Sequence, residues 1–479
     1  MTRFPSSALA LTFALPLFFV GCTDEGEGNE MNTGEGDVPS TYEFDSRFTD
    51  GSSVAYSGQT FRQVLVSSLK EEMSVIQDEI ASGAVFEDGE VAARLMFYYR
   101  FDSASSGDIP HLLSTSPAPL QSTWNDISSD KDLEGKIAGN DEVGQHKDWT
   151  TEMVGWDAAA SPSDLIVQWI EAVDDLAVAY SAGDIPDDPE GAQIESFYIS
   201  PEGLDYQQLI QKFLLGAVNF SQGADDYLDD DIEGKGLLSD NTEAVEGKSY
   251  TALEHQWDEG FGYWGGASNY LDYTDDEIAA AGGRPEFASG YNDIDGDGAI
   301  DLTSEINYGA SVNAAKRDRG AASDAPTDMS TETMNAFLAG RHIIATAEGA
   351  LSDEQLDALR AERDAALLGW EKAIAATAIH YFNDSIRDTN ADEYSFSDHT
   401  KHWGELKGFL LSLQFNPHSP LNDADLATIH GLVGTAPVFP SDEGVGDYLA
   451  DLVTARDLLA AAYGFDAANI GDENGENGW

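Results

Sequence analysis

The chain of 479 residues has a single cysteine, Cys22, so it cannot form an intramolecular disulfide or a zinc site built from several thiolates. It is also poor in basic residues: 24 Lys and Arg stand against 88 Asp and Glu, and the net charge is -64. Such a charge repels nucleic acid and anionic headgroups, and it attracts cations. The chain lacks a Gly-rich phosphate loop, a Gly-x-Ser-x-Gly motif and a His-Glu-x-x-His motif, which favours a non-enzymatic role.

Hydrophobic residues make up 42% of the chain, enough to build a substantial core. The length allows one large domain or two to three ordinary ones. The acidity has two explanations that the sequence leaves open, namely a saline habitat with a heavily hydrated surface, or a functional need for cations.

The N-terminal segment 1–22 has the form of an export signal. Its apolar run, residues 8–20, is too short to span a bilayer as a stable helix. The small residue Gly21 directly before the lone Cys22 is typical of the cleavage site of bacterial lipoproteins, although Phe19 stands where Leu is usual. We therefore predict that Cys22 is lipidated and anchors the protein to a membrane. An ordinary secretory signal with an incidental cysteine is the alternative.

The segment after the cysteine predicts where the protein is held. Thr23 follows Cys22, where Asp would indicate retention at the inner membrane, so we expect the outer membrane of a Gram-negative cell. Residues 23–41 are rich in Gly, Glu and Asn and predict a flexible tether. The body, expected over 42–465 and followed by a polar tail at 466–479, would face the periplasm or the cell surface.

The body has helical periodicity and almost no strand pattern. Apolar residues recur at three- and four-residue steps, and Ser161-Pro162-Ser163-Asp164 is a strong helix start signal. We predict an all-α bundle, with loop-rich stretches at 84–160 and 416–445. Helices are expected at about 61–83, 161–180, 206–220, 331–350, 352–383, 406–415 and 448–463.

A short pattern occurs twice in the chain. Residues 257–263 and 403–409 both read W-x-E-x-x-G-aromatic, and histidines precede both. The repetition predicts two related helical halves that face each other across a pseudo-twofold axis, and a chance match is the alternative.

The segment 293–305 has the carboxylate spacing of an EF-hand-like calcium loop. Acidic residues occupy its first, third, fifth and ninth positions, and Gly298 permits the sharp turn. The twelfth position is Ser304, which cannot supply a bidentate carboxylate, so a loop without a full EF hand is expected. Ile300 would anchor the loop in the core, and a helix would begin near Leu302. The predicted Ca²⁺ ligands are Asp293, Asp295, Asp297, Ala299, Asp301 and Glu305; an acidic turn without an ion is the alternative.

A second candidate site combines histidine and glutamate on the repeated segments. Residues three or four apart on a helix share a face, which relates His255 to Glu259 and relates His399, His402 and Glu405 to one another. Facing helices that carry such groups can bind iron or another transition metal in a bundle core. The alternative is a set of core histidines hydrogen-bonded to neighbouring carboxylates.

Several segments, taken in order, resemble bacterial lipoproteins grouped as domain of unknown function 4856. The resemblance covers roughly residues 42–465, and because the activity of that family is not established it implies no function. The segments that carry it are Tyr56–Arg62, Lys212–Ala217, Glu254–Tyr263, Asp297–Glu305, Trp370–Lys372 and His402–Phe409.

A more distant resemblance is to the imelysin group, which consists of exported, helical, duplicated proteins linked to iron uptake. His402 and Glu405 match the Gly-x-His-x-x-Glu motif of that group, whereas Thr400 replaces its glycine. The resemblance implies a connection to metal uptake, or the peptidase activity once ascribed to that group.

Taken together, these patterns favour a non-enzymatic lipoprotein of the cell envelope that binds a ligand or metal. An outer-membrane uptake receptor, a small ligand or a metal would be its partner, and nucleic acid would not. Two alternatives from other classes stay open. One is a metal-dependent hydrolase that uses the His/Glu cluster, and the other is a structural or adhesive surface protein stiffened by calcium.

Overall fold

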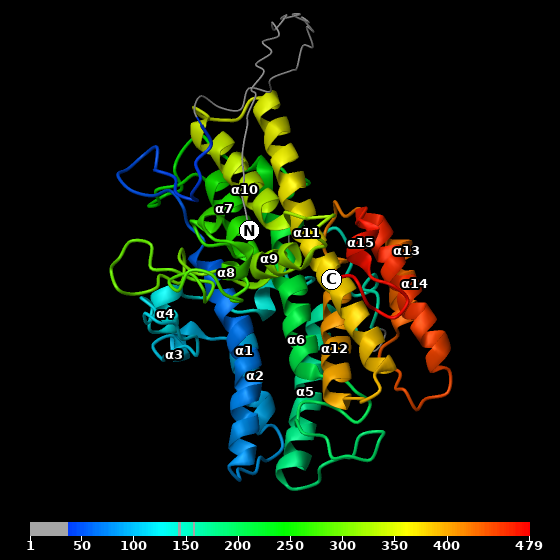
Figure 1. The fold of residues 1–479 in the computed structure, drawn as a ribbon. Coiled ribbons are helices and arrows are strands. Elements are labelled where there is room, and N and C mark those ends of the chain that lie inside the picture. Colours follow the sequence, from blue (N-terminus) through cyan, green and yellow to red (C-terminus); the bar gives the residue numbers. More distant parts are fainter. Residues whose placement is uncertain (1–36, 142–144, 157–158) are drawn as a thin grey trace, which may run out of the picture. The chain divides into compact units, whose positions relative to one another are not determined.

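The computed structural model describes residues 37–141, 145–156 and 159–479. The predicted signal, Cys22 and residues 23–36 of the predicted tether lie outside these residues. In the described part the chain forms fifteen α-helices and no β-sheet, only isolated bridges (Figure 1), which confirms the all-α fold. Across the same residues, we find no helix with both the length and the apolar character needed to span a bilayer.

The helices differ widely in length. The shortest four are α3 (Ser103–Ser106), α4 (Trp124–Ile127), α8 (Asp275–Ile278) and α15 (Ala467–Ile470). The longer ones are α1 (Ser57–Ala81), α2 (Glu90–Tyr99), α5 (Pro162–Ser181), α6 (Tyr206–Leu214), α7 (Ala252–Trp264), α9 (Gly309–Gly320), α10 (Met329–Thr346), α11 (Asp353–Asn390), α12 (Phe396–Ser412), α13 (Asp423–Val433) and α14 (Val445–Tyr463).

The seven expected helices all form, and local signals explain their ends. At the start of α5 the Ser161 hydroxyl accepts a hydrogen bond from the Asp164 N–H at 3.1 Å, and Pro162 occupies the first turn. α12 begins ten residues earlier than predicted. α2 and α13 lie in stretches expected to be loops, because short helices depend on packing against neighbours more than on a long periodic pattern.

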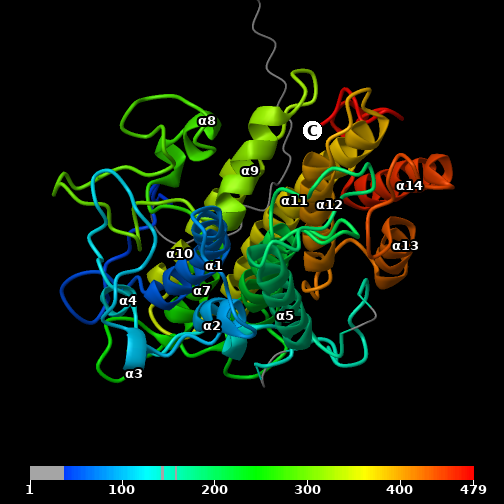
Figure 2. The same cartoon turned by 90° about the horizontal axis from the view of Figure 1, so that it is seen from below.

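The long helices pack side by side around one extended core. α11 packs against α10, α12, α9 and α14, and α6 lies between α1 and α12 (Figure 1). Viewed from below, α1 and α9 lie on one side of the centre and α11 and α12 on the other (Figure 2). Through these contacts α6 links α1 to α12, and α11 links α12 to α9.

α6 continues into two π-helical segments, Leu215–Phe220 and Gly223–Tyr227. π-helical turns are rare and are frequent at functional sites. Here they carry polar residues into the interior, since Asn219, Asp225 and Asp226 are all buried. The sequence pattern predicted a helix here but not this change of helical pitch.

Both ends of the described body belong to the core. Tyr42 is buried, and its ring stacks on that of Phe261 with centroids 3.7 Å apart. At the other end, within the stretch expected to be a polar tail, Trp479 is buried and its indole N–H donates to the carbonyl of Arg317 at 2.9 Å.

The two W-x-E-x-x-G segments lie in α7 and α12 and make comparable contacts. The indole N–H of Trp257 donates to the Phe337 carbonyl at 2.9 Å, and that of Trp403 to the Tyr448 hydroxyl at 3.0 Å. The glycine of each motif lies against a neighbouring helix, α1 for the first and α6 for the second. Duplication of the chain stays a prediction.

Candidate functional site

The predicted calcium loop brings three carboxylates together. Oxygen atoms of Asp293, Asp295 and Asp297 lie within 4.8 Å of one another. The carboxylate of Asp293 accepts hydrogen bonds from the N–H groups of Gly296 at 2.8 Å and Gly298 at 3.0 Å, which curls the loop around it. Among the described residues no basic side chain pairs with these carboxylates, so their mutual repulsion is offset only by backbone N–H groups.

Glu305 holds the loop from behind. Its side chain is 5% exposed, and its two carboxylate oxygens accept the N–H groups of Ile294 and Asp301, each at 2.7 Å. Burial raises the pKa of Glu305, although these hydrogen bonds oppose the shift. Glu305 therefore orders the loop through the backbone, and its role as a calcium ligand stays a prediction.

Ile300 anchors the loop as expected. It is fully buried, its N–H donates to the carbonyl of Ala118 at 3.0 Å, and its carbonyl accepts the N–H of Leu120 at 2.8 Å. The helix expected near Leu302 does not form. The chain makes only a turn there and then becomes extended, because Ile306 pairs with Tyr291 in an antiparallel bridge.

A cavity of about 560 Å³ opens beside the loop. Asp295, Asp297 and Asp301 line it together with Ser52, residues 54–57 and Ser268. Two apolar side chains on its wall, Leu120 and Ile294, are 54% and 40% exposed. A cation on the loop would therefore face a space lined by carboxylates, hydroxyls and apolar groups.

His255 and Glu259 lie at the contact between α7 and the start of α1. The Nδ1 atom of His255 is 2.9 Å from the carbonyl oxygen of Ala55, and its Nε2 atom is 3.7 Å from Glu259 Oε1. That same oxygen accepts a hydrogen bond from Gln59 at 2.8 Å. The contacts of His255 and Glu259 thus join α7 to the start of α1.

His402 lies in a different set of contacts, with acidic residues of α11. Its Nδ1 atom is 2.7 Å from the carboxylate of Asp388. Its Nε2 atom is 3.9 Å from one carboxylate oxygen of Asp384, and the same oxygen lies 3.2 Å from His380 Nε2. Burial disfavours the charged imidazole, but Asp388 and Asp384 outweigh it and raise the pKa of His402. Two imidazoles and one carboxylate oxygen are donors that transition metals accept.

Glu405 and His399, on the same helix, face other partners. Glu405 lies 3.3 Å from the Lys212 ammonium. His399 is fully buried, with its ring nitrogens 3.1 Å from the Tyr394 hydroxyl and 3.4 Å from the Thr389 hydroxyl. Burial lowers the pKa of His399 to about 4, so it is neutral and belongs to the core. Among the described residues, the His255–Glu259 pair on α7 and the His402–Glu405 pair on α12 share no partner.

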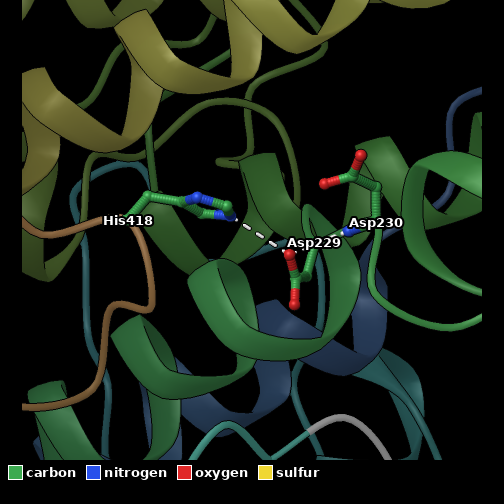
Figure 3. A group of neighbouring side chains, drawn as sticks. All are labelled: Asp229, Asp230 and His418. Carbon is green, nitrogen blue, oxygen red and sulfur yellow. Dashed lines mark hydrogen bonds and ion pairs between the residues drawn. The ribbon is translucent and has the colours of Figure 1, made fainter.

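Sequence reasoning missed the group formed by Asp229, Asp230 and His418 (Figure 3). His418 Nε2 lies 3.1 Å from Asp229, while Asp230 pairs with Arg360 at 2.7 Å and with Arg363 at 3.2 Å. Because guanidinium groups already balance these carboxylates, the group is an ion-pair cluster that closes the π-helical segment. No local pattern signals it, since His418 is far from the aspartates in the sequence.

The fold and the acidic loop define an all-α protein with a cluster of three carboxylates beside a cavity. A family model described as domain of unknown function (DUF4856) matches residues 125–431, and the chain belongs to that family. This confirms the resemblance seen in the sequence, and the matched range contains the loop and both His/Glu pairs. No curated protein and no solved structure matches the chain. The imelysin likeness and lipidation stay predictions.

Proposed function

We propose that this protein is a calcium-binding lipoprotein of the cell envelope that binds a ligand without catalysing a reaction. The observation that carries the proposal is the convergence of Asp293, Asp295 and Asp297 within 4.8 Å, with no basic side chain among the described residues to balance them. A bound cation would offset that repulsion.

The chemistry of the loop favours Ca²⁺ over other metals. All of its candidate donors are oxygen atoms, and Ca²⁺ takes six to eight oxygen ligands from carboxylates, carbonyls and water. The Asp293 carboxylate already orders the turn through Gly298, so the loop is arranged before the ion binds. The ion would contribute to one wall of the adjoining cavity, where a ligand could reach it.

Anchoring is proposed from the N-terminal sequence. The short apolar run and the Gly21-Cys22 pair support lipidation at Cys22. Two or more lipid chains are needed for a firm anchor. The acidic tether would hold the body away from the bilayer, in reach of a small ligand or an uptake receptor in the outer membrane.

Metal analysis of the full-length protein tests the proposal. The chain is purified without chelator, dialysed against calcium and then against metal-free buffer, beside the variants Asp295→Ala and Asp175→Ala. Asp175 is an exposed member of another acidic group and serves as the matched control. We expect one calcium ion per wild-type and Asp175→Ala chain and none in Asp295→Ala. A wild-type chain that retains no calcium would contradict the proposal.

A second candidate function, a transition-metal site linked to iron uptake or to hydrolysis, is favoured by His402 and His380 beside one oxygen of Asp384. Iron or zinc that disappears in His402→Ala and persists in Asp295→Ala would support it. Hydrolytic activity lost in His402→Ala with the fold intact would favour the hydrolase. If the protein binds calcium but no other metal or small molecule, that result would favour a structural or adhesive surface protein.

A further inference from the structure

Two buried hydroxyl groups on the wall of the cavity beside the acidic loop have no hydrogen-bond partner. Tyr56 is 7% exposed and Ser268 is 5% exposed, and both line the cavity. Among the described residues, neither side-chain hydroxyl makes a hydrogen bond. By contrast, the hydroxyl of Tyr42, which lines the same cavity, donates to Asp258 at 2.9 Å. Because a buried hydroxyl without a partner costs free energy, these two groups can bind a ligand in the cavity.

Backbone contacts fix Ser268 beside the loop. Its N–H donates to the carbonyl of Ser304 at 2.7 Å, and its carbonyl accepts the N–H of Tyr42 at 2.7 Å. Ser268 therefore joins the end of the loop to the first segment of the body, and its hydroxyl takes no part in holding either.

Ring packing fixes Tyr56. Its ring lies edge-on to those of Tyr42 and Phe261, with centroids 6.3 and 5.4 Å apart. Burial raises the pKa of Tyr56, and the charges of Asp258 and Asp301 add to the shift. The hydroxyl therefore stays protonated and can both donate and accept a hydrogen bond.

Three carboxylates that line the same cavity keep an oxygen atom to which no described group donates. In Asp301 one oxygen accepts the Gln121 amide at 2.8 Å and the Thr303 hydroxyl at 2.7 Å. One oxygen of Asp295 accepts the Asp297 N–H at 3.0 Å, and one of Asp297 accepts an N–H of the loop at 2.8 Å. The second oxygen of each carboxylate is left for a cation or a ligand.

A calcium ion on this loop would keep coordination positions for a ligand. Ca²⁺ takes six to eight oxygen atoms, and a full EF hand supplies two of them from a bidentate glutamate at the twelfth position. Ser304 stands there, and both carboxylate oxygens of Glu305 accept backbone N–H groups at 2.7 Å. Since Asp295 and Asp297 line the cavity, the remaining positions of the ion would border that space.

The charge of the cavity wall selects against an anionic ligand. Among the described residues that line the cavity, none is basic. The carboxylates outweigh one divalent ion, so a further anion would be repelled. Leu120 and Ile294 add exposed apolar surface to the same wall. The acidic lining residues are Glu43, Asp295, Asp297, Asp301 and Glu305.

We propose that the cavity binds a neutral carbohydrate through a calcium ion on the loop, an inference that rests on the proposed calcium site and adds the class of ligand. Two neighbouring sugar hydroxyls would coordinate the ion, and others would pair with Tyr56 and Ser268. The C–H groups of the sugar ring would cover the apolar part of the wall. The cavity, about 560 Å³, lies within the roughly 300–1,000 Å³ of small-ligand sites.

Surface plasmon resonance tests this assignment with the full-length chain, kept in a detergent without a sugar headgroup. Separate surfaces carry mannose, galactose, glucose, the anion glucuronate and the cation glucosamine, and each is run with calcium and with chelator. We expect the wild-type chain to bind at least one of the three neutral sugars more tightly than either charged one. Chelator is expected to abolish that binding.

Two variants remove one unpaired hydroxyl each and break no hydrogen bond within the protein. Tyr56→Phe and Ser268→Ala are expected to bind calcium like the wild type and the sugar about three- to tenfold more weakly. Tyr180→Phe is the matched control. It removes the same atom from a tyrosine outside the cavity, whose hydroxyl donates to the Glu195 carbonyl at 2.7 Å, and should bind the sugar like the wild type.

Metal analysis of the same samples separates the two proposals. A chain that retains calcium but binds none of the neutral sugars would overturn the carbohydrate proposal and leave the calcium site standing. A chain without calcium would overturn both. Sugar binding that chelator does not change, preference for glucosamine in chelator, or equal sugar affinity in Tyr56→Phe, Ser268→Ala and Tyr180→Phe would also overturn the carbohydrate proposal.

Discussion

Arg341 and Asp258 form an ion pair from which solvent is excluded, with the guanidinium Nε 2.8 Å from the carboxylate and neither side chain exposed. The same guanidinium contacts Glu254 at 3.1 Å, and Asp258 also accepts the Tyr42 hydroxyl at 2.9 Å and the Ala55 N–H at 3.1 Å. The pair therefore fastens the first segment of the body to α7 and α10.

Removal of this guanidinium is expected to destabilise the fold strongly. Arg341→Met leaves Asp258 buried without its cation and leaves Glu254 only Arg47 at 3.8 Å, which costs about 3–5 kcal/mol. Urea unfolding of the variant beside Arg319→Gln, which removes an exposed ion pair, measures the difference. A loss below about 1 kcal/mol in Arg341→Met would show that the carboxylates find other partners.

Calcium is expected to stabilise the wild-type chain against heat and urea. Because the ion would bind only the folded loop, a free concentration about 100 times the Kd adds about 2.7 kcal/mol to the free energy of unfolding. Unfolding with calcium and with chelator, in wild type, Asp295→Ala and the control Asp175→Ala, measures this. We expect the difference to vanish only in Asp295→Ala; its persistence there would place the ion elsewhere.

Stability is expected to fall between mildly acidic and neutral pH. Burial raises the pKa of the Glu371 carboxyl to about 7, although Asn416 at 2.7 Å and Tyr463 at 3.0 Å donate hydrogen bonds to it. The folded state thus binds the proton more tightly than the unfolded chain. The resulting stability is complete below the ordinary pKa of about 4.5 and is lost as pH rises through about 7.

The variant Glu371→Gln isolates this effect. Its free energy of unfolding should vary less between pH 5 and pH 8, by on the order of 3 kcal/mol, because the titrating group is gone. Glu354→Gln, on the exposed start of the same helix, should keep the wild-type slope. Equal slopes in the Glu371→Gln variant and wild type would show that Glu371 is ionised in the fold.

Two glycines on helices are expected to respond oppositely to alanine. A Cβ at Gly408 would lie 2.5 Å from the Cβ of Lys212, so Gly408→Ala forces α12 away from α6 and costs about 1–3 kcal/mol. Gly431 is an exposed residue of α13, and a Cβ there would meet nothing within 4 Å, so Gly431→Ala raises the free energy of unfolding by about 0.5–1 kcal/mol. Denaturant unfolding of both variants tests the contrast, and destabilisation of similar size in both would contradict it.

Local chemistry made much of the fold predictable. Periodic apolar residues and the cap at Ser161 located the long helices, and the spacing of acids in 293–305 located a loop whose first three carboxylates do converge. The ends of these helices were less predictable. α12 extends further than its apolar pattern because His399 and Thr400, polar by sequence, are buried by tertiary packing.

By itself the sequence determined the all-α class, the main helices and the acidic loop, because caps, periodicity and turn glycines act over a few residues. It also carries the prediction of an anchor at Cys22. Only the tertiary structure decided which polar groups meet. The approach of His418 to Asp229, and of Lys70 to the Gln211 oxygen that Lys212 also contacts, depends on packing between segments far apart in the chain, which no local pattern encodes.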